Sequence, residues 1–134
     1  EILAHEPMVI IPSGLKKLKW SEGQPLSVIS IEDYSGAWRS FGELVSKLGI
    51  KREVALESFF SVAQMGVAGF GHALVPIGVA RALGIDDKLL ISLGRHGLMR
   101  PVRFVARKST YSLPVVSNFF LALKAHLQTA ELLG

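Results

Sequence analysis

The feature that most constrains the fold is a regular alternation of strand-like and helix-like runs between residues 26 and 84. Residues 26–31 (LSVISI) alternate apolar and polar side chains, which is typical of a strand. Apolar side chains then recur at helical spacing as far as Gly49, a residue type at which helices commonly end. The pair recurs as strands at 53–57 and 72–75 and helices at 59–68 and 77–83. Tight links between such pairs predict parallel strands joined by helical crossovers.

Both ends of the chain extend this α/β pattern. Short apolar runs predict further strands at residues 7–11, 89–93 and 102–106. Ser112 and Pro114 then open a helix with one apolar face. That face is formed by Val116, Phe119, Phe120, Leu123 and Leu127. We therefore expect a mostly parallel sheet flanked by helices.

Composition narrows the class of protein. The 134 residues are 49% hydrophobic and 19% charged, which indicates a single domain with a buried core and excludes a disordered chain. The net charge of +4 is spread along the sequence, so it weakly favours anionic partners without predicting a nucleic-acid surface. No signal peptide or membrane helix is predicted, and we expect a soluble, cytoplasmic protein. The absence of cysteine and the scattered histidines predict no metal site.

The glycine-rich run at residues 61–76 (SVAQMGVAGFGHALVP) raises the question of a phosphate-binding loop. Such a loop places its glycines after a strand and before a helix. Here the predicted helix comes first and the strand follows, so the order is reversed. We therefore predict that Gly69 ends the helix in a left-handed conformation and that Gly66 allows close packing on the sheet.

Two helix starts are better candidates for binding, because ligands of open parallel sheets lie beyond the carboxyl ends of the strands. The candidate residues are Asp33, Tyr34, Ser35, Gly36, Ser58, Phe59 and Phe60. Hydroxyl and backbone N–H donors there suit a small anion such as a carboxylate. The Asp33 carboxylate would oppose an anion, and it could instead meet an ammonium group or cap the helix. Ser35 is the predicted N-cap, and we expect Phe59 and Phe60 to differ in burial because they are adjacent on one helix.

The sequence gives little support for a catalytic site. Neither Ser35 nor Ser58 lies in a Gly-x-Ser-x-Gly motif, and no histidine is close to either in sequence. His72 could contact a ligand, but at the start of a buried strand a hydrogen-bonded structural histidine is the favoured interpretation. We therefore predict a non-enzymatic protein without catalytic residues, metal or cofactor.

The ordered motifs resemble those of a known family. Residues 58–76 (SFFSVAQMGVAGFGHALVP) are similar to the signature of the effector-binding domain of LysR-type transcriptional regulators. The segments "HEPMVIIP", "LSVISIEDYSGAWRSFGELVSKLGI" and "MRPVRFVARKSTYSLPVVSNFFLALKAHL" fit the same order. The resemblance implies a type II periplasmic-binding-protein-like fold with a small effector in the cleft between two lobes.

The family layout also implies that part of the domain is missing from this chain. Residues 13–95 would form a complete second lobe, and residues 1–12 and 96–134 would supply the hinge strands and the last strand and helix of the first lobe. DNA binding would belong to an absent N-terminal domain. The apolar face of the last helix would then stay exposed and favour self-association. The predicted function is sensing of a small carboxylate-bearing effector; the alternative is a solute-binding protein of a transporter with the same fold.

Overall fold

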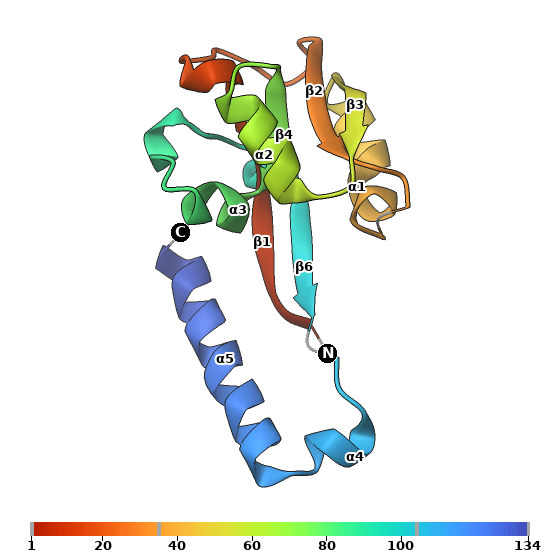
Figure 1. Cartoon of the computed structure of the whole chain (residues 1–134), viewed down its shortest axis with the longest axis vertical. Helices are drawn as coiled ribbons and strands as arrows, with labels where there is room; N and C mark the ends of the chain where they lie inside the picture. The colour runs from red at the N-terminus through yellow and green to blue at the C-terminus, as the bar shows by residue number, and fades with distance from the viewer. Residues whose placement is uncertain (1, 35, 104, 134) are drawn as a thin grey trace. The chain divides into compact units, whose positions relative to one another are not determined.

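The computed structural model describes residues 2–34, 36–103 and 105–133, which form two compact units (Figure 1). One unit comprises residues 7–100, and the other comprises residues 1–6 with 101–134. The strands are β1 (Ile2–Ile11), β2 (Leu26–Ile31), β3 (Ile50–Leu56), β4 (His72–Pro76), β5 (Ile91–Ser92) and β6 (Met99–Arg103). The α-helices are α1 (Gly36–Lys47), α2 (Phe59–Val67), α3 (Ile77–Ala82), α4 (Lys108–Tyr111) and α5 (Pro114–Leu133). Short 3₁₀ turns lie at Ser13–Leu15, Asp87–Leu89 and Gly94–His96.

The sheet has the order β3-β2-β4-β1-β5, and β6 pairs with β1. Strand β2 runs parallel to both β3 and β4, as the helical crossovers predict. Strand β1 runs antiparallel to β4 and β5. The parallel part of the sheet is thus built by the repeated strand–helix pairs. Because β2 and β3 are parallel, their carboxyl ends lie at the same end of the sheet.

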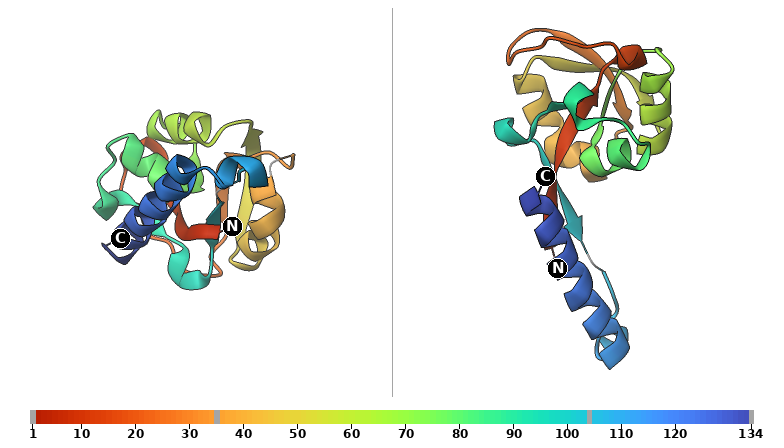
Figure 2. Two further views of the ribbon diagram at one scale, coloured as in Figure 1. Left: turned by 90° about the horizontal axis from the view of Figure 1, so that it is seen from below. Right: turned by 90° about the vertical axis from the view of Figure 1, so that its left-hand side faces the viewer.

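Helices α1 and α2 cover opposite faces of the parallel strands (Figure 2). Successive side chains of β1 point to opposite faces of the sheet. Met8 and Ile10 pack in the apolar layer that includes α1, while Val9 and Ile11 pack in the layer that includes α2. All four of these side chains are fully buried. Helix α1 adds Phe41 and Val45 to its layer at the spacing that the sequence predicts, and Leu48, directly after the helix, packs in the same layer.

The glycine-rich run comprises most of α2, the turn of residues 68–71 and strand β4, in the order that the sequence predicts. Gly69 has a φ of 91°, so it adopts the left-handed conformation that ends many helices. A Cβ on Gly66 would lie 2.7 Å from the Cβ of Ala73 on β4. The helix therefore approaches the sheet at a distance that only glycine permits.

Several strand boundaries differ from the prediction, and β1 begins at Ile2 rather than at residue 7. Strand β6 comprises Met99–Arg103 rather than 102–106. The prediction treated Pro101 as part of a loop, but proline is tolerated in a strand that lies off the main strand order of a sheet. The run at 89–93 contributes only Ile91–Ser92 to a strand, after a 3₁₀ turn capped by Asp86. Strand β3 comprises Ile50–Leu56 rather than 53–57. It is the first strand in the sheet order, so its charged residues lie on a border strand.

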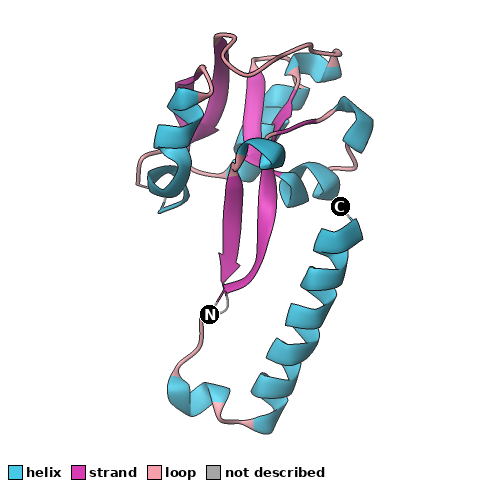
Figure 3. Cartoon of the chain, turned by 180° about the vertical axis from the view of Figure 1, so that it is seen from behind, coloured by secondary structure: helices cyan, strands magenta, loops and turns pink. Residues whose placement is uncertain are grey.

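In the unit of residues 1–6 and 101–134, α5 packs through part of its predicted apolar face. Phe120 is only 2% exposed, and it clusters with Ala4 and with the partly buried Val102, Leu123 and Leu127. The sequence predicted that this face stays exposed; Phe119 is 59% exposed, as expected, whereas the burial of Phe120 departs from the prediction. Figure 3 shows α4 and α5 as consecutive helices, and the Tyr111 ring of α4 meets Phe120 edge-on at 5.5 Å. Helix α4 itself was not predicted.

Candidate functional site

Ser58 positions the start of helix α2. Its backbone is extended (φ −133°, ψ 136°), and its hydroxyl oxygen accepts a hydrogen bond from the Phe60 N–H at 3.2 Å. The Ser58 carbonyl accepts the first helical bond from the Val62 N–H at 3.0 Å. Ser58 is thus an N-cap, and its hydroxyl proton remains able to donate to an acceptor placed before the helix.

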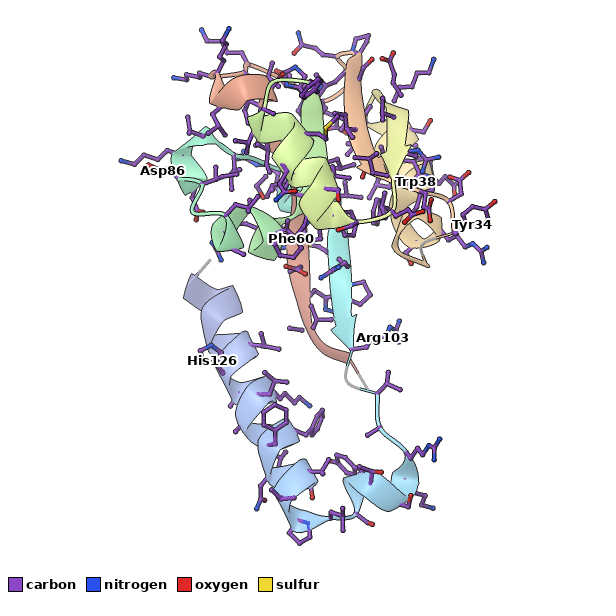
Figure 4. All side chains as sticks on the ribbon, viewed as in Figure 1. Tyr34, Trp38, Phe60, Asp86, Arg103 and His126 are labelled. Atoms are coloured by element: carbon purple, nitrogen blue, oxygen red, sulfur yellow. The ribbon has the colours of Figure 1, made fainter. Side chains whose placement is uncertain are left out.

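Phe59 and Phe60 differ in burial, as expected. Phe59 is partly buried and packs against the apolar layers on both faces of the sheet. Phe60 is 50% exposed, and Figure 4 labels it at the start of α2. Phe59 therefore anchors the helix start, while Phe60 offers an aromatic surface to solvent.

Arg100 is a site residue that the sequence analysis missed. Its guanidinium carbon lies 5.7 Å from the centroid of the Phe59 ring, within the range of a cation–π contact. Arg100 belongs to β6, far from residues 58–60 in the sequence. The structure thus adds a cation to the serine and aromatic side chains at this helix start. The sequence predicted a strand at residues 102–106 and gave no signal of this contact.

The loop after β2 is held by Arg52 of β3. The Arg52 guanidinium forms an ion pair with the Asp33 carboxylate and donates from Nη1 to the Ile31 carbonyl at 2.6 Å. The same guanidinium stacks over the Trp38 ring, 4.0 Å from its centroid. Because this pair offsets the charge of Asp33, the conflict between that carboxylate and an anionic ligand is reduced.

The other residues of this loop have distinct placements. Tyr34 is 86% exposed, and Figure 4 shows it at the outside of the loop. Gly36 begins α1, and its carbonyl accepts from the Ser40 hydroxyl at 3.0 Å. Ser35, the predicted N-cap, lies outside the described residues.

The two candidate loops follow adjacent parallel strands. The Glu32 N–H donates to the Leu56 carbonyl at 3.0 Å, so β2 and β3 are still joined immediately before the loops begin. Asp33 and Ser58 consequently emerge from the same edge of the sheet. Of the two, the Ser58 loop is the better anion site, since it carries no carboxylate between Ser58 and Phe60 and contacts Arg100.

His72 has the structural role expected from its position. Its Nδ1 accepts a hydrogen bond from the Ser13 N–H at 2.9 Å, which ties the first 3₁₀ turn to the start of β4. Among residues 2–34, 36–103 and 105–133, no group of three or more His, Asp or Glu side chains could hold a metal ion. No helix in the same part of the chain is long and apolar enough to cross a membrane.

Comparison with known proteins relates this arrangement to a family. Residues 1–128 match the model of the LysR substrate binding domain. No curated protein is similar enough in sequence to count as a match.

Two solved structures share the fold. The bromide-bound regulatory domain of HypT from Salmonella typhimurium is 20% identical, with a TM-score of 0.56 over 97% of this chain and 64% of that one. The sulfate-bound regulatory domain of a mutant OxyR2 from Vibrio vulnificus is 19% identical, with a TM-score of 0.53 over 95% and 64%. The chain thus spans less than two thirds of either structure.

Proposed function

The chain belongs to the LysR substrate-binding domain family, and from this membership we propose that it is the effector-sensing part of a LysR-type transcriptional regulator. The effector is a small anion, such as a carboxylate-bearing metabolite, held in the cleft between the two lobes of the family's domain. Residues 13–95 supply the complete second lobe, and residues 1–12 and 96–134 supply the hinge strands and part of the first. The solute-binding alternative has no support in the comparisons, which match regulatory domains.

Within this proposal, the observation that supports an anion site is the contact of Arg100 with Phe59, next to the Ser58 cap. An effector carboxylate at this helix start would meet the Ser58 hydroxyl, the positive end of the α2 dipole and the Arg100 charge. The Phe60 ring, half exposed, would cover an apolar part of the molecule. Anions bound to the HypT and OxyR2 regulatory domains agree with this chemistry.

Two further proposals follow from family membership, and a third follows from the exposed side chains of α5. DNA binding belongs to an N-terminal domain of the parent protein, and the effector controls it through movement of the lobes. The regulator acts in the cytoplasm. Self-association uses the apolar side chains that remain exposed on α5, including Phe119 and Leu121.

A thermal-shift screen of small carboxylates, amino acids and aromatic acids, with sodium sulfate included, tests the site. At least one of these compounds should raise the melting temperature, because a ligand that binds only the folded state stabilises it. Ser58→Asp is the informative variant: aspartate caps helices as well as serine does, but its charge repels an anion. Arg100→Gln removes the cation. Both variants should lose the ligand-induced shift.

Lys88→Gln is the matched control, since it removes an exposed positive charge outside this site. It should keep the full thermal shift. A shift that persists in both Ser58→Asp and Arg100→Gln would contradict the proposed anion site. Loss in Ser58→Asp alone would place the effector at the helix start without a contribution from Arg100.

A further inference from the structure

A surface pocket of about 410 Å³ lies between helix α1 and the first residues of β3, within the unit of residues 7–100. Its apolar wall includes the buried side chains Val45 and Ile50, together with the partly buried Trp38. Lys51 and Arg52 contribute the charged lining. None of the candidate residues 33–36 and 58–60 lines it, so this pocket is separate from the proposed effector site.

The Trp38 ring is fixed in this pocket by its neighbours. A Cβ at position 42 would lie 2.9 Å from Trp38 Nε1, so the indole rests against a helix backbone that glycine leaves bare. Arg52 covers the ring at 4.0 Å, and Phe41 meets it edge-on at 5.6 Å. Figure 4 labels Trp38 beside β3. The indole is therefore preorganised rather than a loose surface side chain.

Two of the side chains that line the pocket, Trp38 and Lys51, are hydrogen-bond donors. No acceptor among the described residues takes a hydrogen bond from Trp38 Nε1, and no described carboxylate pairs with Lys51. Trp20 provides a contrast, because its Nε1 donates to the Gln24 carbonyl at 2.9 Å. The pocket thus presents an indole N–H and an ammonium group beside an apolar wall.

The surrounding charges leave this pocket positive. Asp33 offsets Arg52 through their ion pair, and Glu43 lies 4.0 Å from Lys47 on the exposed side of α1. No carboxylate lines the pocket itself. Lys51 therefore supplies the charge that remains without a partner among the described residues.

We propose that this pocket binds a small organic acid as a second ligand site. The carboxylate accepts from Trp38 Nε1 and pairs with Lys51, while the apolar body of the acid packs on Val45 and Ile50. The volume of the pocket is within the range of about 300–1,000 Å³ that small-molecule sites occupy. Arg52 lines the pocket and contacts both Trp38 and Asp33. A ligand in the pocket would therefore lie beside the Arg52–Asp33 ion pair that holds the loop after β2.

Titration of the ¹⁵N-labelled chain with sodium benzoate tests this site, because the two tryptophans give separate indole N–H signals. The Trp38 signal should shift and saturate as the carboxylate accepts its hydrogen bond. The Trp20 signal should stay in place, since its N–H already has a protein acceptor. Benzamide, the neutral counterpart of benzoate, should bind more weakly. A Trp20→Phe variant assigns the two signals.

Lys51→Gln should weaken benzoate binding by roughly two- to fivefold, as expected for an exposed charge pair, and added salt should reduce the difference. The control Lys88→Gln should bind benzoate like the unmodified chain. Ser58→Asp should also leave the Trp38 shift unchanged, which separates this site from the proposed effector site. A Trp38 shift that never saturates, or that is equal in Lys51→Gln and the unmodified chain, would overturn the proposal.

Discussion

The two units of the chain differ in how completely they bury their apolar side chains. Residues 7–100 contain two layers of buried side chains, one on each face of the sheet, with members such as Leu74 and Val75 fully buried. In residues 1–6 and 101–134, the described apolar cluster has only Ala4 and Phe120 as buried members. Large apolar side chains on α5 and before it remain exposed, including Val115, Phe119 and Leu121.

The difference indicates where the stability of the chain resides. Burial of apolar area is the main favourable contribution to folding, so the two-layer unit should unfold cooperatively on its own. The second unit buries less apolar area, so its folding alone releases less free energy. The stability of α5 should therefore depend more on contacts made by its exposed apolar side chains. Four substitutions test this contrast.

Leu74→Ala should have the largest effect, because Leu74 is fully buried in the α1 layer of the sheet. We expect the free energy of unfolding to fall by about 2–5 kcal/mol, the range for large-to-small changes in close-packed cores. Urea denaturation followed by circular dichroism measures the change. A loss below about 1 kcal/mol, the average for point mutants, would contradict a tightly packed layer.

Phe120→Ala should act locally. In close-packed cores such a change costs about 3–5 kcal/mol, but this cluster is small and we expect a smaller loss. Amide hydrogen exchange should show lower protection in α5 and unchanged protection in β2 and β4. Equal loss of protection in both units would show that the chain unfolds as one body.

Gly66→Ala should destabilise the two-layer unit by about 1–2 kcal/mol, since overpacking outweighs the better helix propensity of alanine. The new Cβ would lie 2.7 Å from the Cβ of Ala73. Ala122→Leu is the matched change on the exposed side of α5, and it should leave the unfolding free energy nearly unchanged. Urea denaturation of both variants compares the two helices directly.

Phe119→Ser should have the smallest effect on stability, within about 0.5 kcal/mol, because this side chain is exposed. It should nevertheless weaken the proposed self-association, which sedimentation velocity over a range of concentrations detects. Ser117→Ala, on the same helix, is the control and should associate as the unmodified chain does. Identical sedimentation of the unmodified chain and Phe119→Ser would remove α5 from the proposed interface.

The sequence alone predicted the features that depend on near neighbours along the chain. The strand–helix alternation, the left-handed Gly69 and the close approach at Gly66 were all predicted, and with them the family. They follow from hydrophobic periodicity and from the conformational freedom of glycine, which act within a few residues. The Ser58 cap is equally local, because its partner is two residues away.

Tertiary structure alone decided which distant side chains meet. Arg100 reaches Phe59, and Arg52 joins Asp33 to Trp38, only because β6 and β3 take definite places beside other elements. A one-residue change of strand register would turn each of these side chains to the opposite face. Register and strand order are set by packing of the whole sheet, so no short stretch of sequence contains them. For this reason the sequence predicted the helix start at which we propose that the effector binds, while the cation beside it and the Trp38 pocket emerged only from the folded chain.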